Sequence, residues 1–222
     1  MKIPFVQQTE AAPFQKSRVR PDDVSPRTWQ AARVVSMLAN PMVLCPLCFL
    51  GVAMRAAPRW PTRLKWWSLS CGLMTLVPLI HVRWGVRTGR LSDHDVSVRQ
   101  ERFVPYAAQI ATVGATYGLL RALRAPRPII AVVVSVAGAM VVITGVTTVW
   151  KMSMHVMGAG GTVAVLTLVY GRRALPLASL IPLVGWSRYT LDHHTPAQAA
   201  SGAAVGVLAP VLIFHVMRPL KK

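Results

Sequence analysis

The chain has 222 residues, 53% of them hydrophobic, and its mean hydropathy of +0.44 excludes an ordinary soluble domain of this length. A formal charge of +18, from 25 basic and 7 acidic residues, would suggest nucleic acid in a soluble protein. Here the basic residues cluster in short gaps between apolar runs, as in membrane loops beside anionic headgroups. We therefore expect membrane lipids, and no nucleic acid, as partners.

The predicted elements begin after a polar N-terminal tail. Residues 1–31 lack a helical apolar period and are predicted to be flexible. Residues 32–222 are predicted to form one all-α membrane domain, a bundle of about six to seven transmembrane helices. Tryptophans fall near the segment ends, as in an interfacial aromatic belt. The apolar segments run roughly over 32–54, 66–86, 104–122, 128–149, 152–171, 174–187 and 195–217.

The alternating path of these segments predicts which polar blocks share a membrane face. The 87–103 loop, the 150–155 turn and the 188–194 turn should lie on the same side of the bilayer. These are the most polar blocks of the chain, so we expect them to converge on one site. The basic residues divide almost evenly between the two sides and do not assign the cytoplasmic face.

The block around His194 has the features of an anion site. Thr195 can cap a helix and Pro196 suits a first helical turn, so His194 should precede a helix N-terminus, where a bound anion is favoured. Gln198 is placed to reach the second ring nitrogen of the histidine. Arg188, at the end of the preceding segment, offers a guanidinium fork for phosphate oxygens.

The block around His155 is similar. His155 begins the fifth apolar segment, with Ser153 as a cap and Lys151 just before it. An imidazole that enters a membrane helix is costly without a partner, which favours a functional role. The alternative for each histidine is a helix-end side chain bonded to a neighbouring loop. In the third polar block, Arg99 and Arg102 would share one helix face, or would belong to a solvated loop that binds headgroups.

These residues resemble the motifs of the type 2 phosphatidic acid phosphatase superfamily over residues 83–217. Ser187-Arg188, five residues, His194, three residues and Gln198 match its third motif, with Gln198 in place of an aspartate. Ser153 and His155 match the serine and histidine of its Pro-Ser-Gly-His motif. Arg102 resembles the arginine of its first motif, Lys, six residues, Arg-Pro, although Phe103 replaces the proline and Asp95 stands at the lysine position.

The resemblance implies a metal-independent lipid phosphatase without a cofactor. His194 would attack phosphorus and form a phosphohistidine, and His155 would protonate the departing oxygen. Arg102, Ser153 and Arg188 would hold the phosphoryl oxygens. Arg99 or Lys151 would replace the missing lysine, and Gln198 or Asp192 would orient His194. Polyprenyl phosphates or diphosphates, phosphatidic acid and phosphatidylglycerol phosphate are candidate substrates, in a multi-pass protein of a bacterial-type plasma membrane.

Three other functions remain open. A non-catalytic relative would keep the fold and a phosphate pocket as a membrane scaffold or lipid-binding protein. A magnesium-dependent prenyltransferase-like enzyme would need paired aspartate-rich loops, for which the chain offers Asp93 and Asp95. A channel or transporter would be expected to carry a charged residue in the middle of an apolar segment.

Overall fold

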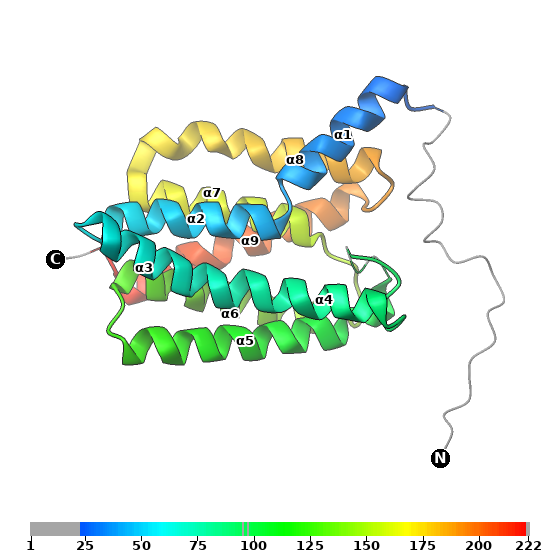
Figure 1. Cartoon of the computed structure of the whole chain (residues 1–222). Coiled ribbons are helices and arrows are strands. Elements are labelled where there is room, and N and C mark those ends of the chain that lie inside the picture. Colours follow the sequence, from blue (N-terminus) through cyan, green and yellow to red (C-terminus); the bar gives the residue numbers. More distant parts are fainter. Residues whose placement is uncertain (1–22, 95, 97, 221–222) are drawn as a thin grey trace, which may run out of the picture.

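The computed structural model describes residues 23–94, 96 and 98–220, and their fold is an all-α bundle (Figure 1), which confirms the predicted fold class. A π-helical turn over Gly72–Leu76 joins the third helix to the fourth. The two helices form one long stretch, Trp60–Arg87, which contains the predicted segment 66–86. The helices are α1 (Pro26–Leu38), α2 (Pro41–Ala56), α3 (Trp60–Cys71), α4 (Val77–Arg87), α5 (Phe103–Ala122), α6 (Arg127–Val146), α7 (Met154–Tyr170), α8 (Leu180–Thr190) and α9 (Pro196–Met217).

Several of these helices have the length and apolarity of membrane spans. Four helical stretches qualify, and α1 with α2 would make a fifth as one span bent by 49°. One of the four, Met154–Thr190, folds back at Gly171 (φ +67°), so that α7 and α8 run side by side in opposite directions (Figure 1). The multi-pass membrane architecture is therefore confirmed, while length and apolarity alone identify four or five of the six to seven expected helices.

The N-terminal region differs from the prediction in two ways. Residues 26–31, placed in the flexible tail, belong to α1, because Ser25 accepts a hydrogen bond from Thr28 N and Pro26 opens the helix. The predicted segment 32–54 is broken at Asn40, because Pro41 disfavours helical backbone in the residue before it. The predicted tail residues 1–22 lie outside the described part of the chain.

Glycines bring α7 and α9 into close contact. A Cβ atom added to Gly202 would lie 2.5 Å from the carbonyl oxygen of Ser153, and one added to Gly206 would clash with the carbonyl oxygen of Met157. Such close approach is typical of small-residue packing between membrane helices. It places the first turn of α7, with His155, beside the first turn of α9, which follows His194.

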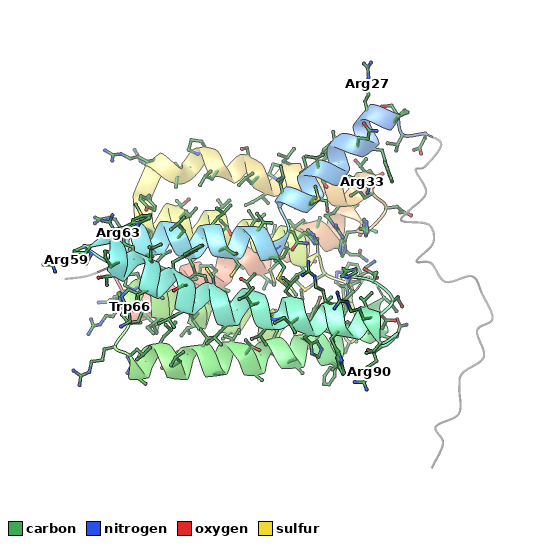
Figure 2. The ribbon with its side chains drawn as sticks, viewed as in Figure 1. Arg27, Arg33, Arg59, Arg63, Trp66 and Arg90 are labelled. Carbon is green, nitrogen blue, oxygen red and sulfur yellow. The ribbon has the colours of Figure 1, made fainter. Side chains whose placement is uncertain are left out.

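One end of the bundle collects the polar segments (Figure 1). The 88–102 loop, the 147–153 connection and the α8–α9 turn lie there, with α1 beside them, as the alternating path predicted. Both ends carry basic residues, with Arg27, Arg33 and Arg90 at this end and Arg59 and Arg63 at the other (Figure 2). Arg90 and Arg33 stack on the rings of Trp84 and Trp29, as expected for cations and tryptophans at an interface.

Candidate active site

A cavity of about 520 Å³ opens among the helices at the polar end of the bundle. Both predicted histidines, His155 and His194, line it, and so do Arg102 and Arg188. All four side chains are buried, although they come from three separate stretches of the chain. The rest of the lining is largely apolar and reaches between α2, α4, α5, α6 and α7. The cavity therefore joins a cationic head to an apolar interior.

His194 is held in one tautomer by Gln198. A single amide oxygen of Gln198 lies 3.2 Å from the backbone nitrogen of Thr195 and 3.3 Å from His194 Nδ1. Because the backbone N–H can only donate, the acceptor atom is the oxygen, and His194 must donate to it from Nδ1. The proton therefore sits on Nδ1, and Nε2 keeps its lone pair. Gln198, one of the two residues expected to orient His194, is the one that contacts its ring here.

The surroundings of His194 favour its neutral form. The pKa of His194 is lowered from 6.5 to about 2, mainly by burial and then by the positive charges of Arg188, Lys151 and Arg102. The hydrogen bond with Gln198 acts in the opposite direction, and its effect is smaller. The imidazole is therefore uncharged at physiological pH, which a nucleophilic histidine requires.

His155 occupies the first turn of α7, which Ser153 caps. Its Nε2 lies 3.5 Å from Nδ2 of Asn40, the residue at the break between α1 and α2. Asn40 also accepts a hydrogen bond from Met42 N at its Oδ1, which identifies Nδ2 as a true amide donor. His155 therefore accepts at Nε2 and carries its proton on Nδ1.

The two buried arginines connect separate parts of the chain. Arg188 donates from Nη1 to Ser36 Oγ of α1 at 2.6 Å. Arg102 donates from Nε to Val96 O at 2.9 Å and from Nη1 to Met152 O at 3.3 Å. Arg102 thus joins the 88–102 loop to the residue before Ser153. Two guanidinium groups in one low-dielectric cavity give it a positive potential, which favours anions over cations.

Ser153 and Lys151 do not line this cavity. Ser153 is fully buried, its Oγ accepts from Val156 N at 3.4 Å, and it is not one of the described residues that line the cavity. Lys151 is half-buried. Burial lowers its pKa, Arg102 and Arg188 add to that effect, and the carboxylates of Asp192 and Asp93 oppose it. Lys151 therefore acts on His194 through its charge, and Ser153 acts as the cap of α7.

The remaining candidates are placed differently. Asp192 is exposed at a left-handed position (φ +55°), and its charge acts on Lys151, whereas the ring of His194 bonds to Gln198. Arg99 lies in a short 3₁₀ turn, and its side chain lies outside the described residues, as does Asp95. Within the part of the chain that the structure describes, no group of three or more His, Cys, Asp or Glu side chains is arranged to hold a metal ion.

No protein-family model, curated protein or solved structure matches this chain. The resemblance to the phosphatase superfamily therefore rests on the sequence motifs alone.

Sequence reasoning missed two residues of the site. Asn40 and Ser36 lie in the N-terminal region, more than 110 residues from the histidine and arginine that they contact. The Asn-Pro pair at 40–41 does indicate a helix start. Its link to His155 has no local signal, because it depends on how α2 packs against α7.

Proposed function

We propose that the protein is an integral-membrane lipid phosphatase that acts through a phosphohistidine intermediate. The observation that carries the proposal is the cavity in which His194 and His155 lie together with Arg102 and Arg188. Its apolar continuation between the helices suits a lipid tail, and its cationic head suits a phosphate group. A polyprenyl phosphate or diphosphate, or a phospholipid phosphate, in a bacterial-type plasma membrane fits this combination.

The chemistry follows from the tautomer of His194. Nε2 attacks phosphorus with its lone pair, and the bond between phosphorus and the lipid oxygen breaks with its electrons on that oxygen. His155, protonated in the presence of the phosphate dianion, gives its proton to the departing oxygen. Arg102 and Arg188 stabilise the equatorial phosphoryl oxygens in this buried cavity. Water then attacks phosphorus and gives a proton to His155, which is now neutral. The bond between phosphorus and Nε2 breaks, inorganic phosphate leaves, and both histidines are regenerated.

Gln198 makes this site different from one with a carboxylate partner. An amide oxygen accepts the Nδ1 proton of His194 but adds no negative charge to stabilise the imidazolium character that develops during attack. A neutral hydrogen bond contributes about 1–2 kcal/mol less than a charged one. The chain therefore combines a correctly oriented nucleophile with a modest electrostatic contribution from its orienting residue.

The test is phosphate release by the purified full-length protein in detergent, over a panel of polyprenyl and phospholipid phosphates. We expect His194→Ala to lower release by about a thousandfold or more, and His215→Ala, an exposed histidine at the far end of α9, to leave it unchanged. An acid-labile phosphoprotein formed from labelled lipid phosphate should disappear in His194→Ala. EDTA should have no effect, and vanadate should inhibit.

A panel without any release would contradict the proposal. If inorganic phosphate still bound in that case, with a requirement for Arg188, the protein would be a non-catalytic lipid-binding relative. Loss of activity with EDTA would instead favour the magnesium-dependent alternative.

A further inference from the structure

A second opening leads to the same site. A groove of about 880 Å³ lies between α1 and the end of α8. Asn40, His155 and Arg188 line both this groove and the catalytic cavity. The two spaces therefore meet at one imidazole and one guanidinium, and a molecule at the reaction site has two directions in which to leave.

The lining of the groove differs from that of the cavity. Gln30, Arg33 and Ser36 of α1 face His193 and Arg188 across it, and none of its lining residues is acidic. The guanidinium of Arg33 lies 4.8 Å above the ring centroid of Trp29, another residue of the groove. Figure 2 shows Arg33 on the part of α1 beside α8, whereas Arg27 points outward from the far end of the helix.

The cavity and the groove differ in the free energy that a phosphate ion would need to pass through them. A phosphate dianion that moved through the apolar cavity would lose its hydration without compensating partners, which costs several kcal/mol or more. The groove offers cations and hydrogen-bonding groups instead. A lipid alcohol has the opposite preference and stays with the apolar wall.

We infer that the groove between α1 and α8 is a second subsite for a phosphate-class anion, with Arg33 as its outer cation. The inference rests on the proposed phosphatase function. Two sources supply an anion of this chemistry: inorganic phosphate on its way out of the site, and the distal phosphate of a lipid diphosphate headgroup.

The test compares Arg33→Gln with the matched control Arg27→Gln, on the same helix and exposed like Arg33. Binding of labelled inorganic phosphate to the full-length protein in detergent is measured without turnover. We expect Arg33→Gln to weaken binding about twofold to fivefold, as for a single exposed cation, and Arg27→Gln to leave it unchanged. Gln30→Glu, which adds a negative charge inside the groove, should weaken binding in the same way and carries the test if Arg33→Gln folds poorly.

Two kinetic measurements distinguish inorganic phosphate from the headgroup of a lipid diphosphate as the anion in the groove. A raised inhibition constant for inorganic phosphate, with KM unchanged, identifies the groove as the exit of the product. A raised KM for a lipid diphosphate, with KM for the monophosphate unchanged, identifies a headgroup subsite. Either result supports the subsite. Equal phosphate binding in Arg33→Gln, Gln30→Glu and Arg27→Gln would overturn it, and this outcome does not depend on whether any lipid is hydrolysed.

Discussion

Arg188 of α8 and Ser36 of α1 share a buried hydrogen bond of 2.6 Å from Nη1 to Oγ. A second bond beside it, from Ser187 Oγ to Ala32 O at 2.7 Å, fastens the same two helices. Arg188, which we propose binds phosphate, is thus held in position by α1, the helix that is bent by 49° from the axis of α2.

Replacement of Ser36 by alanine should therefore reduce activity. The substitution removes the hydroxyl that accepts a hydrogen bond from the buried guanidinium of Arg188. We expect the loss to weaken transition-state binding by about 1–2 kcal/mol, which corresponds to roughly tenfold in kcat/KM. Kinetics with a lipid phosphate measure the effect. Ser68→Ala, on α3 at an exposed position, is the control and should change nothing. Equal kinetics in the two variants would argue that Arg188 keeps its position without α1.

Gln198 and Asp192 should differ strongly as orienting residues. Gln198→Ala removes the acceptor that fixes the tautomer of His194 and part of the cap of α9, so we expect about a tenfold loss of kcat or more. Asp192→Asn should stay within about twofold, because its charge acts on Lys151. Gln198→Glu keeps the acceptor, adds charge and should move the pH–rate profile. A larger loss in Asp192→Asn than in Gln198→Ala would reverse the assignment.

Burial of His194 predicts a loss of stability in acid. Its pKa is about 2 in the folded protein and 6.5 as the ordinary value. Below pH 6.5 the unfolded chain binds a proton that the folded chain does not, so the free energy of unfolding falls as pH drops, by about 1.4 kcal/mol per pH unit. At higher pH this residue contributes no pH dependence. The free energy of unfolding, measured between about pH 4 and 5.5, should approach this slope, and the slope should be smaller in His194→Gln. An identical slope in both proteins would place the effect elsewhere.

Asn40 should act on His155 separately from its role as a helix cap. Asn40→Ser keeps a cap for α2 but removes the side-chain contact that positions the ring of His155, and should lower kcat several-fold. Asn40→Asp keeps the cap and places a carboxylate beside the ring, which favours imidazolium against the nearby charge of Arg188. The alkaline limb of the pH–rate profile should then move to higher pH. A purely structural Asn40 would change kcat without moving either limb.

The contact between α7 and α9 should tolerate no side chain at Gly206. Alanine there would clash with the carbonyl oxygen of Met157, and overpacking of this kind costs about 1–3 kcal/mol. Gly138→Ala on α6 is the matched control, because nothing lies within 4 Å of its added Cβ. Thermal unfolding in detergent should separate the two variants. A stable Gly206→Ala protein would show that the helices can move apart at little cost.

Local sequence signals explain much of the fold. Ser153 and Thr195 were recognisable as caps, and the positions of His155 and His194 at helix starts followed from them. The alternating apolar segments placed both on the same side of the membrane. The prediction that the flexible tail extends to residue 31 was wrong, because it relied on polar composition and overlooked the helix start signal at Ser25-Pro26.

The rest of the site depends on packing across long stretches of chain. Asn40 and Ser36 reach His155 and Arg188 only after α1 and α2 settle against α8 and α7. The choice between Gln198 and Asp192 likewise needed the left-handed turn at Asp192, which directs that carboxylate to solvent. Neither the contacts of Asn40 and Ser36 nor the backbone conformation at Asp192 can be inferred from the periodicity and spacing of the sequence.

The glycine contact between α7 and α9 also has a mechanical consequence. Where two backbones touch, no flexible side chain separates them, and the pair moves as one stiff body. A bilayer that thins, thickens or tilts these helices would carry both imidazoles along together, so the spacing between them should be insensitive to the lipids in which the protein works.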